Sequence, residues 1–174
     1  MAQSDICWVP AHELAAKVAA RELSPVEIID ACLTRIEAVN PDLNAFCFIY
    51  PEEAREAARQ AEMAVMAGET LGPLHGVPIA IKDLTSTCGK RTTLGSYAYE
   101  NWVPDHDAAI VEKLREAGAI MVGKTTTPEF AHAPITASPL WGLTRNPWNL
   151  SHTPGGSSGG SGAAVAAGCV PLAE

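Results

Sequence analysis

The spacing of apolar residues predicts helices over the first third of the chain. After residue 25, apolar side chains recur every three or four positions, which is the spacing of one helix face: Val26, Ile29, Leu33 and Ile36. Ser24 and Glu27, with a proline between them, form a capping box that predicts where this helix begins. Asn40-Pro41 predicts its end, because proline disfavours helical backbone in the residue before it. A second helix is expected over residues 51–68.

Two short apolar runs follow this helical segment and predict buried strands. They span residues 77–81 and 119–123, and each leads directly into a lysine, Lys82 and Lys124. A helical pattern over residues 107–117 lies between them. Strand, helix and strand joined by short connections predict a right-handed crossover and therefore a parallel sheet of the α/β class.

The last third contains a segment with little periodicity, followed by a loop rich in glycine and serine. Residues 125–154 contain five prolines, and a segment this long without regular elements is usually functional or lines a site. It leads into Gly155-Gly156-Ser157-Ser158-Gly159-Gly160-Ser161, after which an alanine-rich helix is expected over residues 162–167. A further strand is expected to open at Val170. Because nothing at this end resembles a domain boundary, we expect the chain to be part of a longer protein.

Composition and charge narrow the classes of function. The 174 residues carry a formal net charge of −8 with no run of Lys or Arg, which argues against binding of nucleic acid or of an anionic membrane. Neither a secretory signal nor a membrane-spanning run is visible. The cysteines show no C-x-x-C spacing and no cluster with histidine that resembles a metal site: Cys7, Cys32, Cys47, Cys88 and Cys169. We therefore expect a cytoplasmic protein with reduced thiols and with no metal or other cofactor.

The loop of residues 155–161 admits four interpretations. It could be a flexible linker, although the apolar helix that follows would hold it in place. It could cradle an anion on backbone N–H groups, although it lacks the ending of a P-loop and has no strand directly before it. It also matches the G-x-S-x-G nucleophile elbow with Ser158 as nucleophile, a motif that again requires a preceding strand. Finally, it could hold a serine within reach of a lysine base.

Lys82 is placed to act as such a base. A serine hydroxyl is a poor nucleophile or proton carrier without an adjacent base. A lysine can fill that role when burial keeps its amine neutral, and Lys82 follows five uncharged residues of a predicted buried strand. The alternative is a lysine that reaches water or pairs with Asp83.

Three long motifs, taken together, resemble the amidase signature family. They are residues 72–83, ending in Ile81-Lys82-Asp83, residues 107–125, ending in Gly123-Lys124-Thr125, and residues 146–161, from Asn146-Pro147-Trp148 into the Gly/Ser loop. The resemblance implies an α/β/α sandwich around a mixed, largely parallel sheet with N-terminal helices. Residues 1–174 would then be the N-terminal part of a single domain, with 1–70 as its helical segment and 71–174 as the start of its α/β core.

The family's catalytic residues carry over motif by motif. In that family a Ser–cis-Ser–Lys triad cleaves amides, which implies Lys82 as the base and Ser157 as the bridging serine after a cis peptide bond. Gly156 and Ser158 are expected to support the loop, and Ala131 aligns with a position that lines the acyl pocket in relatives. The nucleophilic serine and the oxyanion-hole amides belong to a segment expected beyond the last residue.

The function implied by the resemblance is an amidase. It would form an acyl-enzyme and release an amine or ammonia from a small-molecule amide, without metal or cofactor. An amidotransferase subunit that releases ammonia from glutamine is an alternative, although residues 141–149 look more like those of stand-alone amidases. A non-catalytic anion-binding module is another alternative if the natural chain ends at Glu174. The amphipathic N-terminal helices could also pack on a second copy, so a homodimer is a further expectation.

Overall fold

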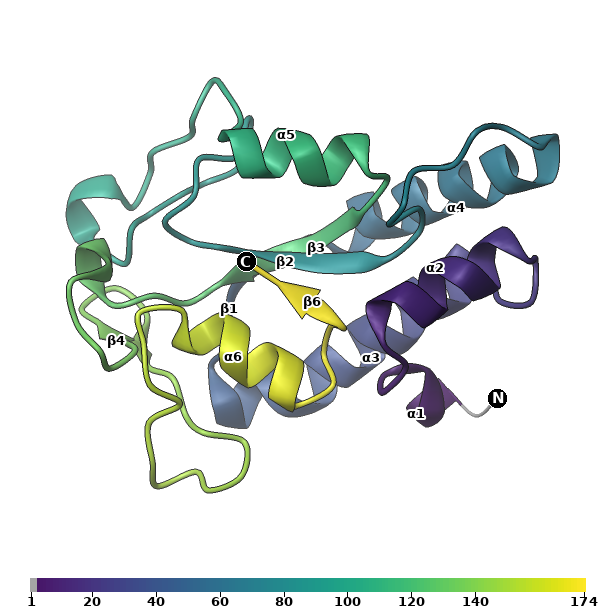
Figure 1. The fold of residues 1–174 in the computed structure, drawn as a ribbon. Helices are drawn as coiled ribbons and strands as arrows, with labels where there is room; N and C mark the ends of the chain where they lie inside the picture. Colours follow the sequence, from purple (N-terminus) through teal and green to yellow (C-terminus); the bar gives the residue numbers. More distant parts are fainter. Residues whose placement is uncertain (1–2) are drawn as a thin grey trace.

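Helices lie on both faces of a four-stranded sheet in the computed structural model, which describes residues 3–174 (Figure 1). The helices are α1 (Gln3–Ile6), α2 (Ala11–Ala19), α3 (Pro25–Leu43), α4 (Pro51–Ala67), α5 (Ala109–Glu116) and α6 (Gly159–Ala166), with 3₁₀ turns η1 (Tyr97–Tyr99) and η2 (Glu129–Ala131). The strands are β1 (Phe46–Ile49), β2 (Pro78–Lys82), β3 (Ile120–Thr125), β4 (Ala137–Ser138), β5 (Gly142–Leu143) and β6 (Leu172–Ala173). In the described part of the chain no helix is long and apolar enough to cross a membrane.

The main sheet has the strand order β1-β3-β2-β6. Strand β2 runs parallel to both β3 and β6, whereas β1 pairs antiparallel with β3 at one edge. Figure 1 shows α5 on one face of the sheet and α3 and α6 on the other. The predicted α/β class, with a mixed and largely parallel sheet, is confirmed.

Alternation along β2 directs side chains into two hydrophobic cores. Ile79 and Ile81 pack with Val111 of α5, whereas Ala80 belongs to the larger core shared with α3, α4 and α6. The larger core contains small side chains that let the helices approach the sheet closely: Ala54, Ala58, Ala61, Ala163, Ala164 and Ala167. Because successive side chains of a strand point to opposite faces, Lys82 leaves the end of β2 on the same side as Ala80.

Helix α3 begins as predicted and ends later than predicted. The Ser24 hydroxyl and the Glu27 carboxylate each accept a backbone N–H bond in the first turn, which completes the capping box. The helix then runs through Pro41 to Leu43, so the predicted end at Asn40-Pro41 is wrong. Pro41 lies in the last turn, and the helix continues only as far as Leu43, two residues beyond it. The Asn40 Oδ1 also accepts from two backbone N–H groups just beyond the helix, which stabilises this end.

Strand β1 was not predicted, and α6 begins three residues earlier than predicted. The run Phe46–Ile49 has only four residues, and a run this short carries no periodicity that separates strand from helix. Gly159 and Gly160 begin α6 although glycine is a poor helix former. A Cβ on Gly160 would lie 2.5 Å from the backbone N of Thr126, so this turn needs glycine in order to pack against the end of β3.

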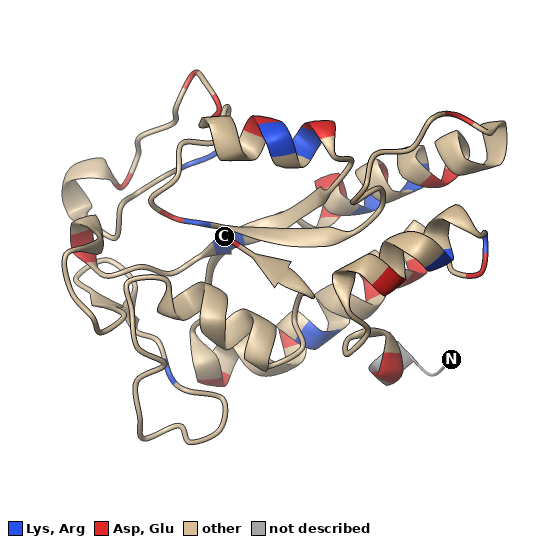
Figure 2. Cartoon of the chain, viewed as in Figure 1, with Lys and Arg blue, Asp and Glu red and all other residues tan. Residues whose placement is uncertain are grey.

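Charged side chains are dispersed over the helices and loops (Figure 2). Some pair within one helix, such as Arg59 with Glu56 on α4 and Lys113 with Glu116 on α5. Exposed pairs of this kind contribute little to the free energy of unfolding. Figure 2 shows no large basic cluster on the described residues, which agrees with the net charge of −8.

Candidate active site

Lys82 lies at the carboxyl end of β2 and is only 5% exposed. Its Nζ donates a hydrogen bond to Ser157 Oγ at 2.7 Å, which joins the strand to a loop 75 residues later in the chain. Burial lowers the pKa of Lys82 below its ordinary value, and the nearby Glu174 carboxylate partly opposes this shift. A buried amine with a lowered pKa, in contact with a serine hydroxyl, is an arrangement suited to proton transfer.

The loop that carries Ser157 is ordered and packed on both sides. The peptide bond between Gly156 and Ser157 is cis. A Cβ on Gly156 would lie 3.0 Å from the backbone C of Pro134, so the loop lies directly against that segment. Thr127 Oγ1 also donates to Ser157 O at 3.3 Å. These contacts exclude the flexible-linker interpretation.

Ser158 does not occupy a nucleophile elbow. It is the N-cap residue of α6, and its side chain makes no capping hydrogen bond. The segment before the loop forms turns with one isolated bridge, between Asn146 and Asn149, rather than the strand that the G-x-S-x-G elbow requires. The Lys82 amine is bonded to Ser157, so the two adjacent serines occupy different environments.

Two carboxylates lie close to Lys82, and neither accepts a hydrogen bond from its amine. Asp83 is fully buried and accepts from Thr93 N at 2.9 Å, from the Thr93 hydroxyl and from Trp141 Nε1 at 3.2 Å. Burial raises the pKa of Asp83 above its ordinary value. Glu174 Oε2 accepts from the backbone N of Lys82 at 3.0 Å. The Asp83 carboxylate is thus held by Thr93 and Trp141, and the alternative in which Lys82 pairs with Asp83 is wrong.

The amino-acid sequence matches the model of a known protein family. The model of the family described as Amidase matches residues 27–174. The chain belongs to the amidase family. A glutamyl-tRNA(Gln) amidotransferase subunit from Acidothermus cellulolyticus is 51% identical over 170 residues, which cover 98% of this chain and 34% of that protein. An acylamidase of Rhodococcus erythropolis is 45% identical over 174 residues, which cover 100% of this chain and 36% of that protein. The chain therefore spans about a third of the length of these curated relatives.

Solved structures of amidases share the fold of this chain. A fatty acid amide hydrolase superposes with a TM-score of 0.93 at 31% identity, over 98% of this chain and 30% of that chain. A bacterial aryl acylamidase of the amidase signature enzymes family gives a TM-score of 0.91 at 34% identity, over 96% of this chain and 35% of its own. The 6-aminohexanoate cyclic dimer hydrolase gives 0.86 at 39% identity, over 96% and 33% of the two chains. The resemblance seen in the motifs is confirmed, and these relatives are hydrolases of amide C–N bonds.

Ala131, aligned by the amidase motifs with a pocket position, lies at the end of η2 and is partly buried. Its backbone has a positive φ of 55°, and its N–H donates to Pro128 O. The turn follows Thr127, whose hydroxyl is bonded to Ser157 O, so this segment of the amidase fold begins beside the serine loop. The part of Ala131 in an acyl pocket stays a prediction.

A bulge in β3 places the side chains of Lys82 and Lys124 on opposite faces of the sheet. The pairing of β2 with β3 shifts register so that Ala80 lies opposite Gly123 and Ile81 opposite Lys124. Residues paired across two strands place their side chains on the same face, so Lys124 shares the α5 face with Ile81. Lys82 leaves on the opposite face. Both lysines were predicted at strand ends, but a one-residue bulge carries no clear signal in the sequence.

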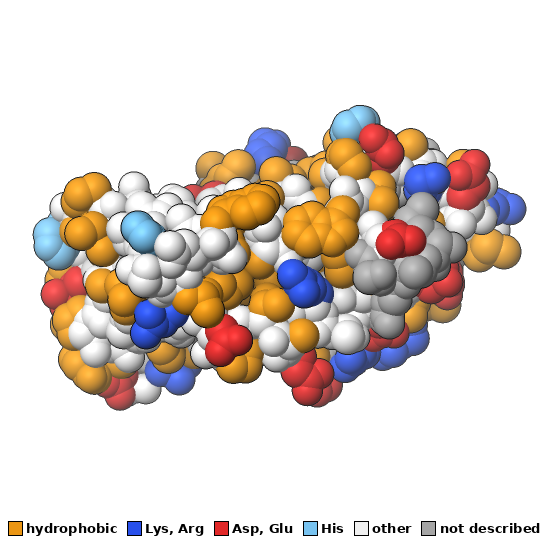
Figure 3. Space-filling view, turned by 90° about the horizontal axis from the view of Figure 1, so that it is seen from below, with side chains coloured by type: hydrophobic (Ala, Val, Ile, Leu, Met, Phe, Trp, Pro, Cys, Tyr) orange, Lys and Arg blue, Asp and Glu red, His pale blue; other side chains and the backbone are white. Residues whose placement is uncertain are grey.

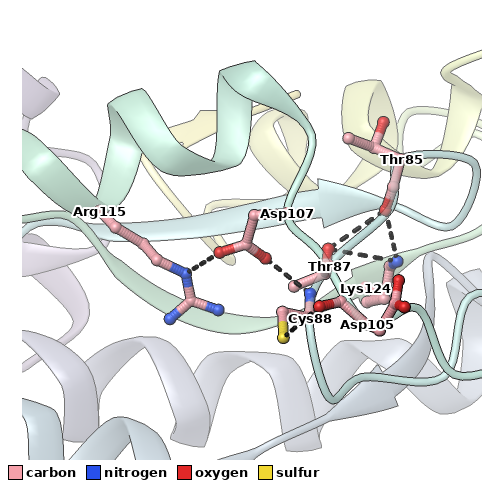
Figure 4. A network of polar contacts seen from close by, with 7 residues as sticks. All are labelled: Thr85, Thr87, Cys88, Asp105, Asp107, Arg115 and Lys124. Carbon is pink, nitrogen blue, oxygen red and sulfur yellow. Dashed lines mark hydrogen bonds and ion pairs between the residues drawn. The ribbon is translucent and has the colours of Figure 1, made fainter.

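Figure 4 shows the Lys124 amine directed toward Thr85 and Thr87, in the loop that follows β2. Its Nζ donates to Thr85 O at 2.9 Å and to Thr92 Oγ1 at 2.5 Å, and the residue is fully buried. Farther along the same loop, the backbone N of Cys88 donates to Asp107 Oδ1 at 2.6 Å. Burial lowers the pKa of Lys124 to about 8, although nearby acidic groups oppose the shift. These contacts tie the loop to the ends of β3 and α5.

A separate groove of about 330 Å³ lies between α3, α6 and the loop after β5. It is lined by Trp8, Arg35, Val39, Asp42, Leu43, Pro147, Trp148, Leu150, Ala166 and Ala167. Figure 3 views the molecule from below, which is the side of α3 and α6 in Figure 1, and shows hydrophobic side chains gathered on this face. The lining includes neither Lys82 nor Ser157, so the groove is not part of the candidate active site.

Proposed function

We propose that this chain supplies the general base and the proton relay of an amide hydrolase, with Lys82 as the base and Ser157 as the relay. The observation that carries the proposal is the 2.7 Å hydrogen bond between the Lys82 amine and the Ser157 hydroxyl, made by a buried lysine with a lowered pKa. The membership of the chain in the amidase family supports the same assignment.

The proposed reaction proceeds through an acyl-enzyme. A second serine, supplied by a segment outside this chain, attacks the amide carbonyl and passes its proton to Ser157, whose own proton moves to the neutral Lys82 amine. The relay then returns a proton to the departing nitrogen, so the C–N bond breaks and an ester to the nucleophilic serine remains. Water hydrolyses this ester by the same relay and releases the acid. Lys82 must be neutral at the start, and its burial favours that state.

The test is substitution of the two residues in the full-length gene product. Lys82→Ala and Ser157→Ala should each lower kcat by about 10²- to 10⁴-fold, which is the usual contribution of general acid–base catalysis. Lys113→Ala is a matched control, because Lys113 lies on the exposed face of α5, where it pairs with Glu116. Turnover near the wild-type value in either site variant, with the control unchanged, would overturn the assignment.

A second candidate is an ammonia-releasing component of an amidotransferase. It is favoured by the 51% identity to an amidotransferase subunit, whereas the acylamidase at 45% identity favours simple hydrolysis. We prefer hydrolysis because residues 141–149 resemble stand-alone amidases. The purified full-length gene product should cleave simple aryl or aliphatic amides without tRNA, ATP or a partner. Activity that appears only in a complex with partner proteins would reverse the preference.

The remaining alternative is a non-catalytic module in which the serine loop binds an anion. It requires a natural chain that ends at Glu174, with an intact mass near 18.3 kDa. Intact-mass measurement of the native protein tests this alternative, and a mass much larger than 18.3 kDa would favour the hydrolase.

We also propose that the protein is cytoplasmic and forms a homodimer through its N-terminal helices. The dispersed charges support the first proposal. The exposed side chains of Met63 and Met66 on α4 support the second, since the apolar faces of these helices otherwise pack within the chain. Cell fractionation and light scattering test them. A membrane-bound fraction, or a monomeric mass at micromolar concentration, would contradict them.

A further inference from the structure

Thr136 is fully buried beside the serine loop and belongs to none of the motifs that predict the site. Its hydroxyl donates to Gly155 O at 2.8 Å and accepts from Gly159 N at 3.1 Å. Its backbone is held as well, since Thr136 N donates to Gly155 O at 3.0 Å and Thr144 N donates to Thr136 O at 2.9 Å. One side chain therefore uses both its donor and its acceptor on the same loop, from a rigid position.

The two bonds of Thr136 lie on either side of the bridging serine. Gly155 precedes Ser157 by two residues and Gly159 follows it by two, so the hydroxyl spans the turn that presents Ser157 Oγ. The N-cap residue Ser158 leaves the first turn of α6 without a side-chain cap, and Thr136 supplies a bond to that turn from 23 residues away. The Thr136 hydroxyl thus joins the start of the loop to the start of the helix.

Ser157 is also held by the packing of Gly156 against Pro134 and by a hydrogen bond to its own carbonyl. Its carbonyl accepts a bond of 3.3 Å from Thr127 Oγ1, which is at the long end of the normal range. Its hydroxyl is the group that must stay within hydrogen-bond reach of Lys82 Nζ. The placement of this hydroxyl therefore depends on the residues that hold the two arms of the loop.

We propose that Thr136 is a positioning residue, which sets the separation of Ser157 Oγ and Lys82 Nζ by bridging Gly155 and Gly159. The inference rests on the proposed function, because the separation matters only if these two groups exchange a proton. A displacement of about 1 Å in a catalytic group can cost about 100-fold in rate. Thr136 itself touches no reacting atom.

Valine is the informative replacement, because it keeps the shape of threonine and removes both hydrogen bonds. It would also leave the buried Gly159 N–H without its partner, so some loss of stability is expected in addition. Thr136→Ser retains the hydroxyl. Thr144→Val is the matched control for stability, because Thr144 is also fully buried and its hydroxyl bonds Asn44 O at 2.8 Å and Thr126 Oγ1 at 2.6 Å.

The experiment measures kcat, KM and Tm of these variants in the full-length gene product with an amide that it hydrolyses. Thr136→Val should lower kcat by about 10- to 100-fold with KM changed by less than about twofold, because the relay and not substrate binding is disturbed. Thr136→Ser should keep kcat within about threefold of wild type. Thr144→Val should lower Tm as Thr136→Val does and keep kcat within about threefold of wild type.

Two outcomes overturn the inference: a kcat for Thr136→Val no lower than for Thr144→Val, or a serine variant as impaired as the valine variant. Should the valine variant fail to fold, Thr136→Cys decides, because a thiol is a weak hydrogen-bonding group. A cysteine variant with wild-type kcat then overturns the inference. Lys82→Ala, measured alongside, separates the two failures. If it keeps activity the proposed function is wrong, and if it is inactive while Thr136→Val is fully active only the role of Thr136 is wrong.

Discussion

Lys82 and Lys124 leave neighbouring strands on opposite faces of the sheet, and their partners differ. The Lys82 amine is hydrogen-bonded to the hydroxyl of Ser157, in the loop that forms part of the proposed site. The Lys124 amine is enclosed by the loop after β2, where three oxygen atoms can accept its three protons: Thr85 O, Thr87 Oγ1 and Thr92 Oγ1. A base must exchange protons with its surroundings, so the less saturated lysine is the one suited to catalysis. Lys124 instead stabilises a loop.

The lowered pKa of Lys124 predicts a specific pH dependence of stability. Its pKa is about 8 in the folded protein and about 10.4 in an unfolded chain, so between these values the unfolded state binds more protons. The free energy of unfolding should therefore rise with pH across this window, by about 1–2 kcal/mol between about pH 7.5 and 9.5. Lys124→Met lacks the titrating group. Urea unfolding of both proteins at the two pH values should show that the free energy of unfolding of the wild type rises relative to that of the variant. A difference between the two proteins that does not change with pH would contradict the shifted pKa.

At the scale of elements, the serine loop and the first turn of α6 depend on a close approach to β3. A Cβ on Gly160 would lie 2.5 Å from Thr126 N and 2.6 Å from Thr126 O, which are backbone atoms that cannot turn away. Gly160→Ala should therefore lower the free energy of unfolding by about 1–3 kcal/mol. Gly162→Ala is the control, because an added Cβ there meets nothing within 4 Å and alanine favours helix by up to about 1 kcal/mol. Urea midpoints measure both, and equal effects of the two substitutions would contradict the packing argument.

The elements that the sequence predicted best were those with strong local signals. The capping box at Ser24 and the apolar run before Lys82 are read from neighbouring residues, and both were found as expected. The resemblance to the amidase signature family also implied that Lys82 and Ser157 act together, and the two side chains are hydrogen-bonded. Contacts between distant residues were not predicted. The bulge that turns Lys124 to the other face and the hydroxyl bridge from Thr136 depend on strand register and loop packing, which no local pattern encodes.

At the scale of the whole molecule, the N-terminal helices and the α/β core share one hydrophobic interior. Residues of α3 and α4 pack in the same cluster as residues of β2, β3 and α6. Arg35 of α3 also donates from its Nε to Ala167 O at 2.8 Å, across 132 positions of sequence. Helices α3 and α4 therefore form part of the core that supports β2 and the serine loop, and we expect these helices and the sheet to unfold together.

Hydrogen exchange in a variant with a core substitution in α3 tests whether the helices and the sheet unfold together. Ile36 is 1% exposed within the shared cluster, so Ile36→Ala should cost about 2–5 kcal/mol. If the molecule opens as one unit, amides of β2 and β3 should then exchange at least about 30-fold faster, as much as those of α3 itself. Thr34→Ala, on the exposed side of the same helix, should leave both rates nearly unchanged. Faster exchange confined to α3 would show that the strand carrying Lys82 is stable without the helices. Equal acceleration would mean that the geometry of the proposed relay depends on packing contacts made by the N-terminal helices.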